Sequence, residues 1–155
     1  MEIRLKELDE KFKYDIAARP GAENFTYCFF CGTCTATCPV AEVNKEYDPR
    51  RIIRMAILGM REAVLSSDII WMCVRCYTCF ARCPQNVKFA DIMEVLRRMA
   101  VEEGYVPEDR LNLIDQLDQK VQELRCHLVR YLLRPTEELA GEIRAIINGL
   151  LEKDG

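Results

Sequence analysis

The chain has 155 residues, of which half are hydrophobic and 30% are charged, so it can build a folded domain and is not a disordered tail. Its formal net charge of −3 is too small to favour a nucleic acid or an anionic membrane surface as a partner. Nine cysteines are unusual for a chain of this size, and their arrangement carries most of the functional information.

No apolar stretch approaches the roughly 18–20 residues that a membrane-spanning helix needs. Residues 1–6 are charged and lack the apolar middle of a signal peptide. We therefore expect a soluble, cytoplasmic protein without direct membrane insertion. In a reducing cytoplasm, clustered cysteines more often hold metal than form disulfides.

The first 24 residues are predicted to form an N-terminal arm. Within it, Phe12, Tyr14 and Ile16 alternate with polar or charged neighbours, which is typical of a short edge strand. No other segment alternates in this way. A mainly α protein is therefore predicted, with a central domain over residues 25–106 and a C-terminal helical extension over residues 107–155, a possible subunit interface.

Eight of the cysteines form two runs of one pattern, C-x-x-C-x-x-C-x-x-x-C-P, and the second run begins 45 positions after the first. The two runs are Cys28-Phe-Phe-Cys31-Gly-Thr-Cys34-Thr-Ala-Thr-Cys38-Pro39 and Cys73-Val-Arg-Cys76-Tyr-Thr-Cys79-Phe-Ala-Arg-Cys83-Pro84. This internal repeat is the strongest signal in the sequence.

A helix with recognisable boundaries is predicted between the runs. Asp48 is a suitable N-cap, and Pro49 suits the first helical position. The residues that recur at helical spacing and form one apolar face are Ile52, Ile53, Ala56, Ile57, Met60 and Val64. The polar break at residues 66–68 ends this helix and precedes a short one, Ile69–Met72, that leads into the second run.

After the second run a helix is predicted from Val87 to Glu103, with Gly104 as its C-terminal stop. Two more helices follow, separated by Pro135. The first has a heptad-like seam formed by Ile114, Leu117, Val121, Leu124, Leu128 and Tyr131. The second has an apolar face formed by Leu139, Ile143, Ile146, Ile147 and Leu150. This apolar surface is expected to pack on the chain's own domain or on another subunit.

The paired runs are typical of two [4Fe–4S] clusters. Three cysteines at C-x-x-C-x-x-C spacing can come from one tight turn, and in two-cluster ferredoxins the fourth cysteine of each run ligates the other cluster. The expected ligands of cluster 1 are Cys28, Cys31, Cys34 and Cys83, and those of cluster 2 are Cys38, Cys73, Cys76 and Cys79. Two clusters in one small domain must lie close together, which suits an electron relay.

The residues around the cysteines agree with this interpretation. The proline after each fourth cysteine turns the chain away from a cluster, and Gly32 permits a close approach of the backbone. Four aromatic residues are expected to exclude water from the clusters: Phe29, Phe30, Tyr77 and Phe80. A structural zinc-binding module is the competing metal site, but zinc knuckles normally use two cysteines each.

Two other features have weaker functional interpretations. Cys126 and His127 lie on a C-terminal helix, where an extra ligand or a redox thiol competes with an ordinary, partly buried helix position, which we favour. Arg50, Arg51 and Arg54 form a basic patch that could bind an acidic partner, although a solvated helix face is the simpler interpretation.

The sequence resembles the small iron–sulfur protein of heterodisulfide reductase, its C subunit, from about residue 8 to residue 106. The segments that carry the resemblance are the paired runs, Asn24, the Cys-Gly-Thr-Cys-Thr-Ala-Thr-Cys-Pro stretch at 31–39, the Asp-Pro-Arg-Arg segment at 48–51, and the stretch 68–79 with Trp71 and Tyr77. The resemblance implies an α-helical ferredoxin fold that binds two [4Fe–4S] clusters.

The resemblance also implies a role. In that family the small C subunit passes electrons from a flavin- and cluster-bearing A subunit to a B subunit, which carries CCG repeats and reduces the mixed disulfide of coenzymes M and B. This chain has no adjacent cysteine pair and hence no CCG repeat. It is therefore expected to be a non-catalytic electron-transfer subunit of an oxidoreductase complex, from an anaerobe.

The competing function from the same helical fold is the iron–sulfur subunit of another oxidoreductase, of the glycolate or succinate dehydrogenase type. The succinate type is disfavoured because no plant-type ferredoxin motif precedes the first run.

Overall fold

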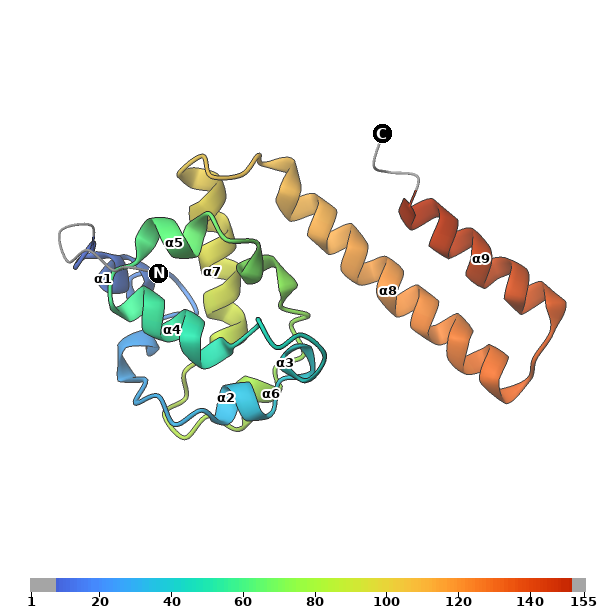
Figure 1. The fold of residues 1–155 in the computed structure, drawn as a ribbon, viewed down its shortest axis with the longest axis horizontal. Coiled ribbons are helices and arrows are strands. Elements are labelled where there is room, and N and C mark those ends of the chain that lie inside the picture. The colour runs from blue at the N-terminus through green and yellow to red at the C-terminus, as the bar shows by residue number, and fades with distance from the viewer. Residues whose placement is uncertain (1–7, 152–155) are drawn as a thin grey trace. The chain divides into compact units, whose positions relative to one another are not determined.

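The computed structural model describes residues 8–151, so the first seven residues of the predicted N-terminal arm and residues 152–155 lie outside the described part. The chain divides into two compact units, residues 1–107 and residues 108–155 (Figure 1). Each unit is helical, and no strand occurs between residues 8 and 151, which confirms the predicted mainly α class.

The first unit consists of short helices around one longer helix. In chain order its elements are α1 (Phe12–Ala17), η2 (Phe25–Tyr27), α2 (Thr33–Ala36), α3 (Pro39–Val43), α4 (Pro49–Ile57), α5 (Arg61–Leu65), η3 (Asp68–Met72), α6 (Thr78–Ala81) and α7 (Phe89–Glu102). The helix predicted over residues 69–72 is therefore a 3₁₀ helix that starts one residue earlier, and the predicted Val87–Glu103 helix is α7.

The predicted edge strand at residues 12–16 is wrong, because this segment forms α1. Phe12 and Ile16 are buried, whereas Tyr14 is 62% exposed. Residues four apart lie on one face of a helix, so Phe12 and Ile16 both reach the core. The spacing of Phe12 and Ile16 fits one face of a strand as well as one face of a helix. Burial of both side chains in the core favours the helix.

The single helix predicted from residue 49 to residue 65 is also wrong, because the chain breaks at Gly59 between α4 and α5. Gly59 has a φ of +80°, and its carbonyl accepts a hydrogen bond of 2.8 Å from the backbone N–H of Asp9. The two segments approach so closely that a Cβ at residue 59 would clash with the Asp9 carbonyl. The bend therefore makes room for the N-terminal segment.

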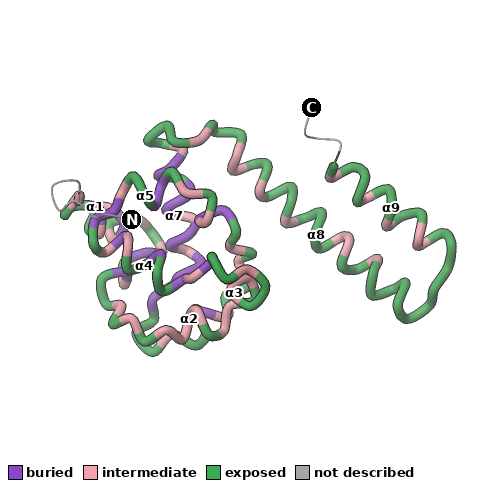
Figure 2. The backbone as a smooth tube through the Cα atoms, in the orientation of Figure 1, coloured by how far each residue is buried: buried purple, intermediate pink, exposed green. Residues whose placement is uncertain are grey.

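The core of the first unit gathers around α7 (Figure 2). Ile92, Met93 and Leu96 on this helix are completely buried, and they are joined by Phe12, Phe25, Ile53, Leu65 and Ile70 from the surrounding elements. Arg97 is the one charged side chain in this core among the described residues, and it is 1% exposed. A buried guanidinium needs hydrogen-bond partners, and these lead to the second cysteine run, as described below.

The N-terminal segment is held to the rest of the unit by Arg61 on α5. Its guanidinium contacts the carboxylates of Asp9 at 2.6 Å, Asp15 at 2.7 Å and Glu103 at 2.8 Å. The hydrogen bond from Arg61 lowers the pKa of Asp9. This network joins the start of the unit to the end of α7.

The second unit is an antiparallel hairpin of α8 (Asp109–Leu133) and α9 (Glu137–Leu151), with Pro135 in the turn as predicted (Figure 1). The predicted seam of α8 is only partly covered: Ile114 and Leu124 are half-buried, whereas Leu117, Val121 and Leu128 are 42–46% exposed. Two helices cover only one side of each other, and no residue of α8 or α9 is fully buried.

His127 lies within the hairpin, where its Nδ1 is 2.9 Å from Oε2 of Glu142 on α9. Its side chain is 18% exposed, in agreement with the expected partly buried helix position, while Cys126 is exposed. None of the helices found between residues 8 and 151 combines the length and the apolar character required to cross a bilayer.

Candidate metal centres

Both cysteine runs begin in the same way. A 3₁₀ helix leads into each first cysteine, η2 into Cys28 and η3 into Cys73. These two cysteines have nearly identical backbone angles, φ −65° and ψ 119° for Cys28 and φ −67° and ψ 120° for Cys73. The sequence repeat is therefore also a repeat of conformation.

Left-handed residues recur at matching positions inside the runs. Phe30 and Arg75 precede the second cysteine with φ of 58° and 48°, and Gly32 and Tyr77 follow it with φ of 84° and 58°. Left-handed angles are costly for any residue except glycine, so they occur where the surroundings enforce them. In each run they bend the backbone around one centre, which brings the first three cysteines to it.

The fourth cysteine of each run lies beyond a one-turn helix, α2 or α6, and these two helices pack against each other (Figure 1). Cys38 is extended, and the following Pro39 starts α3. The backbone N–H of Val87 donates a hydrogen bond of 3.3 Å to Sγ of Cys83. Because α2 and α6 are neighbours, each fourth cysteine is directed toward the other run.

A first cavity brings together Cys28, Cys31 and Cys34 from the first run with Cys83 from the second. The remainder of its wall comes from Phe30, Gly32, Thr33, Arg50, Ile53, Cys79, Val87 and Phe89. Its four principal thiols are those predicted for cluster 1.

A second cavity brings together Cys73, Cys76 and Cys79 from the second run with Cys38 from the first. The other residues in its wall are Val40, Tyr47, Pro49, Val74, Tyr77, Phe89 and Ala90. Its four thiols are those predicted for cluster 2. The two cavities are adjacent, because Cys79 and Phe89 line both of them.

The donor set of each cavity suits an iron–sulfur cluster. Five thiols line the first space and four the second, with Cys79 shared, and a cubane requires four thiolates spread around a compact object. Between residues 8 and 151, no group of three or more His, Cys, Asp or Glu side chains converges on the position of a single ion. Burial raises the pKa of Cys34 and of Cys79 to about 11, and binding of a cluster would require both thiols to lose their protons.

Each centre also has an exposed side. Cys31 and Cys76, the second cysteines of the two runs, are exposed, whereas Cys79 is buried. The Cys31 thiol donates a hydrogen bond of 3.3 Å to the Thr33 hydroxyl, and contacts with Thr33 lower the pKa of Cys31. One cysteine of each set therefore lies at the protein surface, where another protein can approach.

The aromatic residues expected to exclude water do so only in part. Phe30 lines the first cavity and Tyr77 the second, but Phe29 and Phe80 line neither and are 56% and 37% exposed. The residue that sequence reasoning missed is Phe89, which is buried between the two cavities. Its position at the start of α7, five residues after Pro84, was the available signal.

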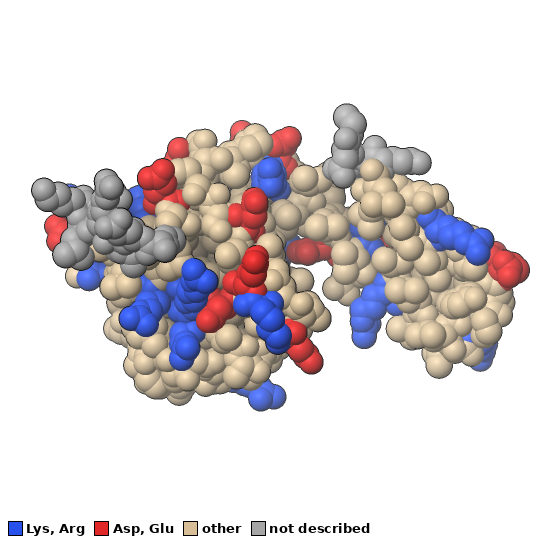
Figure 3. Space-filling model, viewed as in Figure 1, with Lys and Arg blue, Asp and Glu red and all other residues tan. Residues whose placement is uncertain are grey.

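Arg50 was also underestimated. All three arginines of the patch are exposed, as a solvated helix face requires, but Arg50 also lines the first cavity. A Cβ added to Gly32 would lie 3.5 Å from Nη1 of Arg50. A positive charge therefore lies beside the first centre. Elsewhere, basic and acidic side chains are mixed on the face of the first unit seen in Figure 3.

The second centre is supported by the buried Arg97. Its guanidinium donates hydrogen bonds to the carbonyls of Ile70 at 2.9 Å, Trp71 at 3.0 Å and Cys73 at 2.8 Å. These carbonyls end η3 and enter the second run. Arg97 therefore fixes the position of Cys73 from the core side.

The hydroxyl of Tyr47 is buried beside Cys73. It meets no hydrogen-bond partner in the described part of the chain, although the two groups are near enough for each to shift the other's pKa. Burial raises the pKa of Tyr47 far above its usual range. Burial also raises the pKa of Cys73, and the Tyr47 hydroxyl opposes this rise.

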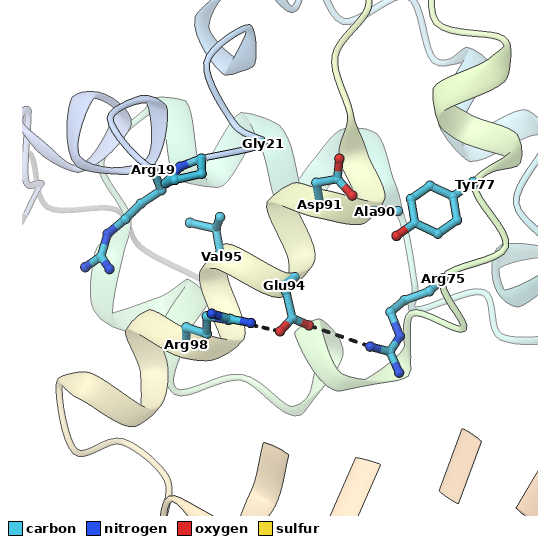
Figure 4. A pocket seen from close by; sticks show the side chains of 10 residues that line it. Arg19, Gly21, Arg75, Tyr77, Ala90, Asp91, Glu94, Val95 and Arg98 are labelled. Carbon is cyan, nitrogen blue, oxygen red and sulfur yellow. Dashed lines mark hydrogen bonds and ion pairs between the residues drawn. The ribbon is translucent and has the colours of Figure 1, made fainter. Parts of the chain in front are cut away.

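A third hollow, of about 390 Å³, lies beside the second run (Figure 4). Four of its charged residues take part in ion pairs: Glu94 contacts Arg98 at 3.1 Å and Arg75 at 3.9 Å, and Arg19 contacts Glu102 at 2.6 Å. Asp91 lies near the Tyr77 hydroxyl; burial raises the pKa of Tyr77, and Asp91 raises it further. The ion pairs hold the second cysteine turn and the N-terminal segment against α7.

The helical fold and the two thiol-lined cavities define the class of protein, which is an α-helical iron–sulfur protein with two adjacent centres. Residues 24–87 match the family model of the 4Fe-4S dicluster domain, so this part of the chain is such a domain.

The relatives identify the group more closely. The chain is 38% identical over 104 residues to the C subunit of the H(2):CoB-CoM heterodisulfide,ferredoxin reductase of Methanothermobacter thermautotrophicus. The matched residues are 67% of this chain and 55% of the relative. The chain is 46% identical over 77 residues to the C2 subunit of the H(2)/formate:CoB-CoM heterodisulfide,ferredoxin reductase of Methanococcus maripaludis, covering 50% of this chain and 41% of the relative.

A third relative, from Archaeoglobus profundus, is named as a protein like the C subunit of heterodisulfide reductase. It is 37% identical over 94 residues, which are 61% of this chain and 50% of the relative. The chain spans about half the length of the curated relatives it matches. The resemblance to the C subunit of heterodisulfide reductase is confirmed, and the chain is a relative of these proteins.

Proposed function

We propose that this chain is the electron-transfer subunit of a cytoplasmic heterodisulfide-reductase-like complex. It accepts electrons from a flavin- and cluster-bearing A-type subunit and delivers them to a CCG-repeat B-type subunit, which carries out the terminal reduction. The chain itself binds and orients two redox centres and turns over no substrate.

The observation that carries this proposal is the pair of adjacent cavities, each lined by three cysteines of one run and the fourth cysteine of the other. We assign Cys28, Cys31, Cys34 and Cys83 to the first [4Fe–4S] cluster and Cys38, Cys73, Cys76 and Cys79 to the second. When bound, the two clusters supply one-electron oxidation and reduction.

The chain's own residues serve this role in three ways. Phe89 fills the space between the cavities and keeps water from it, since it is buried and lines both. Cys31 and Cys76 are exposed, so each centre has an edge that a partner can approach. The cavities meet at Cys79, which keeps the distance between the two centres short, as electron tunnelling requires.

Support for partner subunits comes from the relatives, which are named as C subunits of reductases for the CoB-CoM heterodisulfide; the A-type and B-type identities are part of the proposal. The terminal disulfide and the electron donor of this chain are part of the proposal. The 155 residues contain no adjacent cysteine pair, so the proposal assigns the CCG repeats to the B-type partner.

The test is an anaerobic pull-down of the chain from its native host, with the partners identified by mass spectrometry. Recovery of a CCG-repeat protein together with a large flavoprotein is the expected result. Recovery of a glycolate or succinate dehydrogenase instead would replace the proposed complex and leave the relay in place.

The cofactor is tested separately on the anaerobically purified chain. A brown protein with equal amounts of iron and acid-labile sulfide is expected. A colourless protein that contains zinc and no labile sulfide would contradict the cluster assignment and favour a structural zinc module.

A further inference from the structure

Tyr47 lies in the loop between α3 and α4, two residues before the start of α4. Its side chain is 1% exposed and forms part of the wall of the second cavity. Aromatic packing explains the burial of the ring. It does not explain why the buried ring carries a hydroxyl group, since phenylalanine would fill the same space without a polar atom to satisfy.

A buried hydroxyl without a partner costs free energy, roughly 1–3 kcal/mol, so an unsatisfied one suggests a ligand that completes it. In the described part of the chain the Tyr47 oxygen has no hydrogen-bond partner. The titratable groups that influence it are the thiols of Cys73 and Cys38, both of which line the second cavity, and the guanidinium of Arg97, which is a donor and cannot accept its proton. A protonated thiol is a poor acceptor, whereas a metal-bound thiolate is a good one.

No tyrosine lines the first cavity; the contacts to its sulfurs come from the Thr33 hydroxyl, 3.3 Å from Cys31, and from the backbone N–H of Val87, 3.3 Å from Cys83. Val87 lies two residues before the start of α7, as Tyr47 does before α4, and it lines the first cavity with an apolar side chain. The two centres therefore differ in the side chain that lies two residues before the helix, α4 or α7: a tyrosine at the second cavity and a valine at the first. Hydrogen bonds to the sulfurs of a cluster are one of the factors that set its reduction potential.

We infer that the Tyr47 hydroxyl donates a hydrogen bond to the Cys73 sulfur when that cysteine ligates the second cluster, and that this hydrogen bond raises the reduction potential of the second cluster. The inference rests on the proposed function, because it requires the cluster assignment. Reduction adds one electron and breaks no bond, and the Tyr47 proton remains on its oxygen. The added negative charge strengthens the hydrogen bond, so the reduced form is stabilised more than the oxidised form.

Replacement of Tyr47 by phenylalanine tests the inference. In the anaerobically purified chain with both clusters bound, a redox titration followed by EPR should show one cluster that is harder to reduce. The expected change is about tenfold in its reduction equilibrium constant, which corresponds to roughly 59 mV for a one-electron couple. The potential of the other cluster should stay within the error of the titration.

The matched control is Tyr105→Phe, which removes a hydroxyl from a tyrosine of the same unit that lines neither cavity. It should change neither potential. Two unchanged potentials in a Tyr47→Phe protein that retains full iron and sulfide would overturn the inference while leaving the proposed function intact. Absence of clusters from the wild-type chain would instead defeat the proposed function.

A second substitution covers the case in which Tyr47→Phe loses its clusters. Incorporation of 3-fluorotyrosine at position 47 keeps the shape of the side chain and makes the hydroxyl more acidic, hence a stronger donor. The potential of the second cluster should then rise. A fall, or no change, would contradict donation to the cluster sulfur, because a merely structural hydroxyl would not shift the potential in this direction.

Discussion

The two cysteine runs have the same backbone but different surroundings. Their first cysteines share backbone angles, and left-handed residues recur at the same positions. The first run is nevertheless fixed by hydrogen bonds at the surface: the Thr35 hydroxyl donates to Asp48 at 2.5 Å and accepts from the backbone N–H of Arg50 at 3.0 Å. The second run is fixed from the core by Arg97.

The matching position in the second run makes a different contact. Phe80 corresponds to Thr35, and the ammonium group of Lys88 lies 5.9 Å from the centre of its ring. Lys88 precedes α7 as Asp48 precedes α4. The comparison teaches that the spacing of the cysteines determines the backbone path, whereas the neighbouring side chains give the two centres different charge, hydrogen bonding and support.

The largest effect should come from replacing the fourth cysteines. Cys83→Ala should remove the cluster held by the first run, and Cys38→Ala the one held by the second, because each cavity is completed by the other run. Each variant should retain about half of the iron, with a different EPR spectrum.

Spectra are compared with those of Cys31→Ala and Cys76→Ala, which mark the first and the second centre. If Cys83→Ala resembled Cys76→Ala, each run would hold its own cluster and the crossed assignment would be wrong.

The next largest effect should show whether Arg97 supports the second run specifically. Arg97→Met should lower the free energy of unfolding by about 3 kcal/mol or more, because three buried carbonyls lose a charged donor. The second centre should be lost at a lower urea concentration than the first. Urea titration monitored by visible absorption and by EPR measures both.

Arg98→Met is the matched control, since Arg98 is the next residue of α7 and its side chain is 64% exposed. Its effect should stay below about 1 kcal/mol. Equal loss of both centres in Arg97→Met would mean that Arg97 stabilises the unit as a whole.

A smaller effect is expected from weakening the hydrogen bonds that fix the first run. Thr35→Val removes the hydroxyl that joins the first run to the start of α4 and should cost about 1–2 kcal/mol. The first centre should now be the one lost earlier in urea. Thr37→Val, which removes a hydroxyl bonded only to a backbone carbonyl of its own turn, serves as the control.

The smallest effect concerns the left-handed position after the second cysteine. Gly32→Ala should destabilise by about 1 kcal/mol, because alanine is strained at a φ of 84° although its Cβ would meet only ordinary contacts. Tyr77→Ala should cost less, since the second run already has a side chain in this conformation. Thermal unfolding of both variants gives the difference, and a larger loss in Tyr77→Ala would show that packing of the Tyr77 ring outweighs the strain.

Much of the fold follows from local signals. Asp48 caps α4 by accepting from the backbone N–H of Arg51 at 3.2 Å, as its position before Pro49 predicted. The errors occur where distant segments meet: the bend at Gly59 exists because the Asp9 backbone lies against it, and α1 forms because Phe12 and Ile16 pack into the core. Neither contact is visible in the local sequence.

The site was predictable to a similar extent. The spacing grouped the first three cysteines of each run, because it reflects how far a short turn can reach, and the arrangement of two-cluster ferredoxins added the fourth cysteine of the other run. These groups line the two cavities, while the cluster ligands themselves stay a prediction. Phe89 and Tyr47 were not identified, and Arg50 was assigned only to a basic patch, since their importance depends on which way a helix start faces once the two runs have packed together. The spacing of apolar residues along a helix identifies its buried face, but it does not identify the cavity that this face lines.

The arrangement of the cavities also limits how this protein can be divided. A chain cut between residues 57 and 61 would have one complete cysteine run on each fragment, yet neither fragment would contain four thiols around one cavity, and Phe89 would remain with only one of them. Two halves that look like independent modules in the sequence are therefore obligate partners. Fragments should bind clusters only when they are mixed, and a deletion of either whole run should abolish both centres together.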